Sequence, residues 1–114
     1  MSSKYFIGCL LLLASCSPKS LDDLRVESDA EVKKIVAEMR RVDTKEELLK
    51  KAPLLKKRFT KLGMLLESAR KLGHHPVPPT EASEALFIEM ARLYEIPGAR
   101  EIIEEAESDA IRRL

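Results

Sequence analysis

Tryptophan is absent from this 114-residue chain, and aromatic residues make up only 4% of it. Charged residues, by contrast, account for 34%. A composition that is rich in Leu, Ala, Glu and Lys and poor in aromatic rings favours helices over a β-sandwich or barrel. We therefore expect an all-α protein with one modest core, because about 100 residues bury roughly two-thirds of their unfolded surface.

Other scarcities argue against particular functions. A net charge of +1 is too small for a dedicated nucleic-acid-binding protein, which usually carries a clear basic excess. With four glycines there is no phosphate-binding loop, and no serine lies in a Gly-x-Ser-x-Gly turn. The adjacent carboxylates Glu104 and Glu105 are expected on an exposed face, where an ordinary charged surface explains them. We expect a non-enzymatic protein without a cofactor.

The first 15 residues have the organisation of an export signal. Lys4 supplies a positive charge, and an apolar run follows from Tyr5 to Leu13, which is too short to span a bilayer as a helix. The sequence Leu13-Ala14-Ser15-Cys16 resembles the lipobox of bacterial lipoproteins. The resemblance implies cleavage between Ser15 and Cys16 and a diacylglycerol on the Cys16 thiol. An ordinary N-terminal helix, retained in the mature chain, is the alternative.

The lipobox resemblance has consequences for location and stability. It implies attachment to the cell membrane or outer membrane of a bacterium, with the domain outside the cytoplasm. Three acyl chains, as in mature lipoproteins, would anchor the chain durably. Removal of Cys9 with the signal and acylation of Cys16 would leave no free thiol, so stability would come from helix packing.

After the signal, residues 16–27 are expected to form the lipidated cysteine and a tether, and residues 28–114 a helical bundle. Ser28 with Glu31 has the spacing of a capping box and predicts a helix over about 29–42. Its apolar residues recur at steps of three and four and are expected on one face. They are Val32, Ile35, Val36, Met39 and Val42.

Thr44 and Glu47 repeat the capping spacing and open the longest predicted helix, over about 45–72. Its apolar stripe is Leu48, Ala52, Leu55, Phe59, Leu62, Leu66 and Ala69. Pro53 lies inside it and removes one backbone hydrogen bond. Either a helix ends near Lys51 and a new one starts at Pro53, or a single helix bends there. The unbroken stripe favours the bend.

Two more helices are predicted after the proline-rich linker 74–79. The segment 81–95 is apolar around most of its circumference, from Ala82 to Tyr94, which suggests a central and well-buried helix. Pro97 suits the first position of a helix over 97–113, whose apolar residues run from Ala99 to Leu114. Short connections predict antiparallel neighbours, so we expect an up-and-down bundle of three or four helices.

The histidine pair His74-His75 is the one candidate for metal binding. Together with Glu81 and Glu84 it could gather a divalent cation. However, the side chains of adjacent residues usually point apart, and the spacing lacks the regularity of strong zinc motifs. A solvated loop is the simpler interpretation.

Charge is segregated along the chain. A basic stripe without acids comprises Lys50, Lys51, Lys56, Lys57, Arg58 and Lys61, and an acidic segment without bases comprises Glu101, Glu104, Glu105, Glu107 and Asp109. Three interpretations fit. Each can be a solvated face; the two helices can lie side by side with opposite charges attracting; or the basic stripe can face an anionic surface such as lipid headgroups.

These observations favour a membrane-anchored lipoprotein whose helical domain binds an envelope protein or supports the envelope structurally. Such a domain should expose an apolar or charge-matched groove between helices. The alternative is a lipoprotein that binds a small ligand or metal through the His74-His75 loop.

Overall fold

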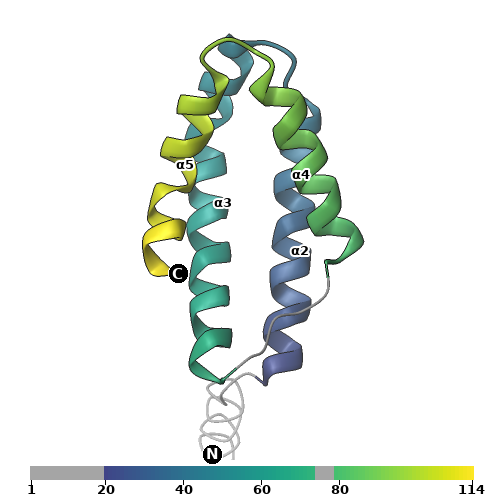
Figure 1. Cartoon of the computed structure of the whole chain (residues 1–114), viewed down its shortest axis with the longest axis vertical. Coiled ribbons are helices and arrows are strands. Elements are labelled where there is room, and N and C mark those ends of the chain that lie inside the picture. Colours follow the sequence, from purple (N-terminus) through teal and green to yellow (C-terminus); the bar gives the residue numbers. More distant parts are fainter. Residues whose placement is uncertain (1–19, 74–78) are drawn as a thin grey trace, which may run out of the picture.

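The computed structural model describes residues 20–73 and 79–114, and over these ranges the protein is all-α (Figure 1). Cys16, Ser15 and the His74-His75 pair lie outside them. The four helices that it describes form a small bundle, and no strand occurs between them. Their bounds are α2 Leu21–Arg40, α3 Lys45–Lys71, α4 Glu81–Tyr94 and α5 Ala99–Arg113.

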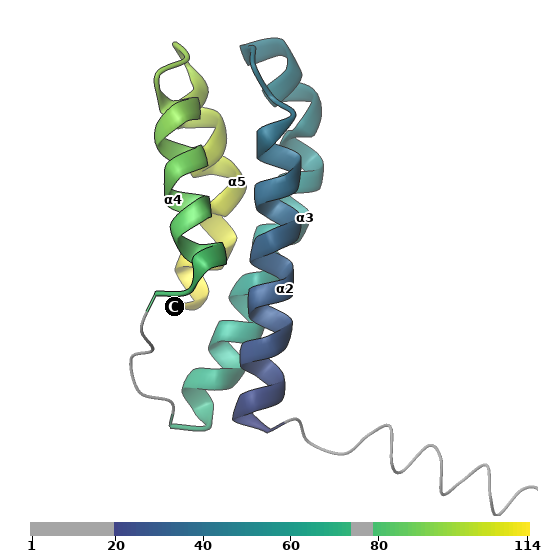
Figure 2. The same ribbon diagram turned by 90° about the vertical axis from the view of Figure 1, so that its right-hand side faces the viewer.

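The bundle consists of a long helical hairpin and a shorter one. The helices run alternately up and down, and α4 with α5 covers only the upper part of the α2–α3 hairpin (Figures 1 and 2). Helix α3 packs against α2 and α5, and α4 packs against α2 and α5. Consecutive helices α3 and α4 therefore lie on a diagonal, whereas the short connections join the packed neighbours α2 and α3, and α4 and α5. The longer connection between α3 and α4, residues 72–80, lets α4 cross to α2.

One apolar core joins all four helices. The predicted stripe on α2 is buried throughout, and most of the predicted stripe on α3 is buried as well. The fully enclosed large side chains are Ile35, Met39, Val42, Leu48, Leu55, Leu93 and Ile103. Below the short hairpin, a second and smaller cluster of Leu24, Leu65 and Ala69 closes α2 on α3.

Helix α2 begins earlier than the sequence pattern predicts. Ser20 is its N-cap, and the Ser20 hydroxyl accepts a hydrogen bond from the Asp23 backbone N–H at 3.1 Å. The Asp23 carboxylate in turn accepts from the Ser20 N–H, which completes a capping box. Residues 21–27, expected as tether, are therefore helical. The expected cap at Ser28 is wrong, because Ser28 and Glu31 lie buried inside the helix against α3.

Helix α3 is continuous through Pro53, so the alternative of a break near Lys51 is excluded. Pro53 lies on the exposed side of the helix, where water can reach the backbone carbonyl that loses its partner. Thr44 caps the helix by accepting from the Glu47 backbone N–H at 3.2 Å.

The last connection differs in detail from the prediction. Gly98 is the N-cap of α5 with a φ of 84°, a left-handed conformation that glycine adopts without strain. Pro97 therefore precedes the cap and is not the first helical residue. At the other end of α5, Leu114 is 57% exposed and does not belong to the core.

Candidate functional site

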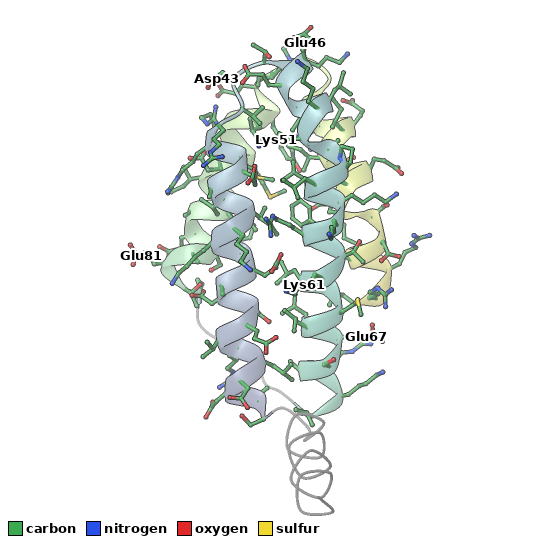
Figure 3. All side chains as sticks on the ribbon, turned by 180° about the vertical axis from the view of Figure 1, so that it is seen from behind. Asp43, Glu46, Lys51, Lys61, Glu67 and Glu81 are labelled. Carbon is green, nitrogen blue, oxygen red and sulfur yellow. The ribbon has the colours of Figure 1, made fainter. Side chains whose placement is uncertain are left out.

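Half of the basic stripe on α3 is used internally. Lys51 donates a hydrogen bond to the Glu38 carboxylate of α2, and this bond holds the pKa of Glu38 below its ordinary value. Arg58 and Lys61 lie 3.5 and 3.6 Å from the Glu31 carboxylate of α2. Figure 3 shows Lys51 and Lys61 on the side of α3 that faces α2. These cations hold the long hairpin together.

Glu31 is the centre of these contacts. The residue is only 2% exposed, and its carboxylate also lies 3.8 Å from the Lys34 ammonium. A buried carboxylate needs such compensation, because leaving water is costly for an ion. Its position between two helices and away from any groove indicates a structural role.

The other half of the stripe is free. Lys50, Lys56 and Lys57 are exposed and form no ion pair with any residue of 20–73 or 79–114. Helices α3 and α5 do lie side by side, as the second interpretation of the charges required. The charge pairing of that interpretation is nevertheless wrong, because the paired residues of the stripe bind carboxylates of α2 and not of α5.

The acidic segment on α5 has its own partners. Glu104 lies 3.8 Å from Arg100, and Asp109 lies 3.0 Å from Arg113. Arg113 also contacts Glu67 of α3 at 3.4 Å, so the α3–α5 ion pair has the opposite polarity from the expected one. Hydrogen bonds from Arg113 hold the pKa of Asp109 and of Glu67 below their ordinary values.

One of the free lysines, Lys56, lines an open apolar groove between α3 and α5, which we call the α3–α5 groove. Its volume is about 540 Å³. Leu49, 52% exposed, and Pro53 contribute apolar surface from α3, and Ile102 contributes it from α5. The complete lining is Leu49, Ala52, Pro53, Lys56, Glu101, Ile102, Glu105 and Ala106.

Helix α4 is peripheral, which corrects the prediction of a central, well-buried helix. Only Ala82 and Leu93 are buried, whereas Phe87 is 72% exposed and Ile88 is 67% exposed. The helix is apolar on most sides, but a single face is enough to pack against α2. We call the outward-facing residues Phe87, Ile88 and Ala91 the α4 ridge.

Helical geometry places the members of the α4 ridge together. At about 100° per residue, Ala91 lies between Phe87 and Ile88 around the helix and one turn further along it. Glu84 and Glu95 fall in the same angular range, one at each end of the ridge. Both carboxylates, and that of Glu81, are exposed and have no ion pair within the two described ranges. The α4 ridge is thus apolar with acidic ends.

Polar contacts hold α4 in the position that exposes this ridge. The Arg92 guanidinium donates to the backbone carbonyls of Met39 and Val42 at 2.8 and 2.9 Å, at the C-terminal end of α2. It also binds Glu89 of its own helix at 2.8 Å. At the other end of α4, the N-cap Thr80 donates to Asp29 of α2 at 2.8 Å. The orientation of α4 is therefore fixed at both ends.

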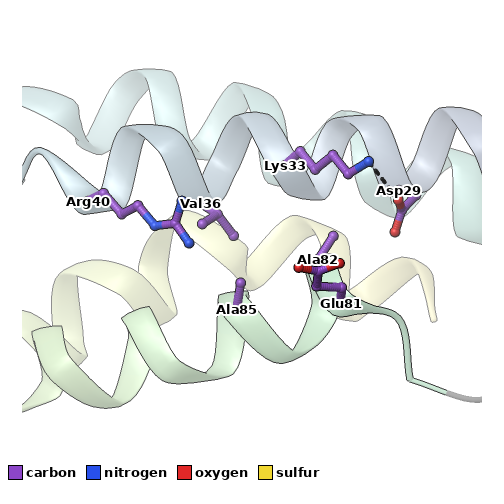
Figure 4. Close-up of a pocket in the computed structure, with 7 residues that line it drawn as sticks. All are labelled: Asp29, Lys33, Val36, Arg40, Glu81, Ala82 and Ala85. Atoms are coloured by element: carbon purple, nitrogen blue, oxygen red, sulfur yellow. Dashed lines mark ion pairs between the residues drawn. The ribbon is translucent and has the colours of Figure 1, made fainter.

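Two further grooves border α4. One, of about 380 Å³, lies between α2 and α4, where the Lys33–Asp29 ion pair and Arg40 line one side and Glu81 lines the other (Figure 4). The other, of about 470 Å³, lies below it between α2, α3 and the start of α4, with Val32, Leu62, Leu66 and Ala69 in its lining. The Ser28 hydroxyl on that side is buried without a hydrogen bond.

A cluster at the junction of α4 and α5 combines aromatic and charged groups. The Arg100 guanidinium lies 4.5 Å from the centre of the Tyr94 ring. Burial, followed by the charge of Glu104, raises the pKa of Glu107; burial, followed by Glu107 and Glu104, raises that of Tyr94. The cluster borders none of the three grooves above, so we assign it to packing.

Within residues 20–73 and 79–114 no group of three or more His, Cys, Asp or Glu side chains is arranged to hold a metal ion. The predicted lipidation and cleavage site at Ser15 and Cys16 and the His74-His75 pair lie outside these ranges and stay predictions. No helix in the described part of the chain is long and apolar enough to span a membrane. No protein-family model, curated protein or solved structure matches this chain.

Proposed function

We propose that this protein is a bacterial lipoprotein, anchored to the cell membrane or outer membrane through Cys16, whose helical domain is a non-enzymatic docking module outside the cytoplasm. The single observation that supports docking is the α4 ridge. Phe87 and Ile88 expose most of their surface on a helix that is otherwise fixed in place. Contiguous exposed apolar side chains with a polar border are typical of protein interaction sites.

The distance from the anchor to the helical domain is short. Helix α2 starts at Leu21, so an extended chain from Cys16 to that residue spans at most about 18 Å. The ion pairs place Arg58 level with Glu31 and Lys51 level with Glu38. At about 1.5 Å per residue, these levels are about 15 and 26 Å above the start of α2.

The height of the basic stripe above the start of α2 decides whether the free lysines can interact with lipid headgroups. With the bundle axis along the membrane normal, the stripe lies beyond the Debye length of about 8 Å at physiological salt, counted from the start of α2. Lipid headgroups then contribute little to its binding. Our proposal therefore assigns Lys50, Lys56 and Lys57 to protein contact in preference to membrane contact.

Two measurements test the two parts of the proposal. The intact mass of the full chain expressed in a bacterial host tests the anchor: we expect loss of residues 1–15 and the added mass of acyl groups on Cys16. A mass that retains Met1–Ser15 without acyl groups would refute it. Replacing Cys16 with serine should release the protein from the membrane fraction.

Photo-crosslinking in intact cells tests the docking surface. A photoreactive residue in place of Ala91 on the α4 ridge should give a discrete cross-linked product. Ala37, an exposed alanine on α2, is the matched control and should give none. Equal yields at both positions, or no product at Ala91, would refute docking at the ridge.

A further inference from the structure

We infer that the partner of the α4 ridge is the α3–α5 groove of a second copy of this chain. Anchored copies then stand side by side in the same orientation, and each contact joins the ridge of one copy to the groove of the next. This inference rests on the proposed docking function and names its partner. Within the described residues the exposed side of α3 that borders the groove is complementary in charge to the ridge, and both surfaces carry apolar side chains. The ridge has acidic ends with no ion pair within the described residues. Lys56 lines the α3 side of the groove, Lys50 and Lys57 are exposed beside it on the same helix, and none of the three has an ion pair there.

The two surfaces also match in height along the bundle. The top of each hairpin provides a common reference, because the Lys45 side chain at the start of α3 reaches Gly98 before α5. Helix α4 ends at Tyr94, so its C-cap Glu95 lies near this level, and counting down the helix at about 1.5 Å per residue places Glu84 about 15 Å below Tyr94. Counting down α3 from Lys45 places Lys50 about 8 Å and Lys57 about 18 Å below it.

A sideways translation of one copy therefore brings opposite charges together. It places Glu95 beside Lys50 and Glu84 beside Lys57, each within the reach of a lysine side chain. Between them, Phe87 and Ile88 come level with Pro53 and the apolar lining of the groove. Glu101 and Glu105 make the α5 side of the groove acidic. Because like charges repel, the carboxylates of the ridge must lie over the α3 side.

The arrangement is compatible with anchoring in one membrane. Translation keeps every copy in the same orientation, so the starts of all α2 helices stay on one side. Because α4 and α3 lie on a diagonal of the bundle, the ridge and the groove belong to different faces of the molecule (Figures 1 and 2). A contact between two different surfaces leaves one of each free and extends into an open row of copies.

Cysteine cross-linking of the full chain in membranes tests the inference. A chain with both E84C and K57C should give a ladder of dimers, trimers and larger products on oxidation. The E84C chain alone and the K57C chain alone should give no ladder, because each lacks the opposing thiol. The parent chain and an A37C/K57C chain are the matched controls. A dimer from E84C alone, or no ladder from the double variant, would overturn the inference.

Charge reversal gives a second and independent test. E84K/E95K should abolish the association of the chain, and adding K50E/K57E to the same chain should restore it. All four residues are exposed, so the substitutions should leave folding intact. Restored association would therefore show that the two sets of charges face each other. Failure to restore association overturns the contact between the ridge and the groove.

The photoreactive residue at position 91 distinguishes self-association of this chain from docking of a different protein. A product whose mass is a multiple of this chain supports self-association. A product that contains a different protein overturns the self-association but leaves the docking function intact. Absence of any product overturns both.

Discussion

Gly63 of α3 lies against Ala110 of α5 so closely that a Cβ atom at position 63 would come within 2.8 Å of the Ala110 Cα. Real Cβ contacts are essentially never this short, so the two helices meet here backbone to backbone. The contact sits near the lower end of α5, where Arg113 also bonds to Glu67. It fixes how α5 lies on α3 and therefore the width of the α3–α5 groove.

Gly63→Ala is expected to destabilise the protein by about 1–3 kcal/mol, because the added methyl group forces the two helices apart. The intrinsic preference of alanine for helices, about 1 kcal/mol, opposes this loss only in part. Chemical denaturation measures the change. Ser68→Ala, at an exposed position of the same helix, is the control and should alter stability by less than about 0.5 kcal/mol. A stabilised Gly63→Ala variant would contradict the close approach.

Glu31→Ala should cost about 2–3 kcal/mol, since it leaves the partly buried Arg58 without its carboxylate. Replacing both residues at once, Glu31→Leu with Arg58→Met, should recover most of that loss, because no partly buried cation then lacks its partner, and Lys34 and Lys61 are exposed. A double-mutant cycle by urea denaturation checks this. Lys61→Met, at a cation that is 59% exposed, serves as the control and should cost less than about 1 kcal/mol. Additive effects of the two core changes would show that the pair is not coupled.

Arg92→Gln should destabilise by about 1.5 kcal/mol, the low end for hydrogen bonds to a charged group, because the side chain is 38% exposed. The variant leaves the Met39 and Val42 carbonyls at the end of α2 without their partner. Hydrogen exchange should then increase in α4 and in the last turn of α2. Arg40→Gln, which removes only the exposed contact with Glu89 at 3.6 Å, should have little effect. Equal effects of the two variants would argue against the capping role.

Glu107→Gln should stabilise the protein at pH 7 and leave it unchanged in acid. Burial raises the pKa of Glu107 above its ordinary value of 4.5, so its ionised form is disfavoured in the folded state. The stability tied to the protonated form is fully present below the unfolded pKa and is lost as pH rises through the folded pKa. Replacement by a neutral amide removes that loss.

Unfolding curves of both proteins between pH 3 and pH 8 measure this difference. The two curves should converge as the pH falls well below the ordinary pKa of 4.5, where the carboxyl group is protonated in both states. Glu105→Gln, at an exposed position of the same helix, is the control. A gain in stability that is the same at every pH would show that ionisation of Glu107 is not the cause.

Much of the local structure follows directly from the order of residues. The stripe from Leu48 to Ala69 predicts a single helix through Pro53, and the structure contains one. Caps at Thr44 and Thr80 mark the starts of α3 and α4, because a hydroxyl at that position satisfies a backbone N–H that the helix leaves free. The start of α2 was predicted wrongly because two capping patterns compete, at Ser20 and at Ser28. The burial of Leu24 against Leu65 decides in favour of the first.

The candidate docking surface was less predictable. An apolar helix such as α4 looks central in the sequence, yet its exposure depends on how many neighbours surround it, and here α2 and α5 cover only part of it. Likewise, the sequence identifies six basic residues but does not divide them into paired and free ones. Gly63 gave no periodic signal, and Ala110 was expected only as one apolar residue of the last helix, although their contact decides how the two helices pack.

The sequence by itself determined the all-α class, most of the apolar stripes on α2 and α3, and the caps of α3 and α4, because these depend on residues within a few positions of one another. Only the tertiary structure decided that α4 packs on α2 and that Phe87 and Ile88 face outward. It also decided that Lys51, Arg58 and Lys61 form ion pairs with carboxylates of α2. The physical reason is that side-chain burial and ion pairing depend on contacts between segments far apart in the chain, which helical periodicity does not encode.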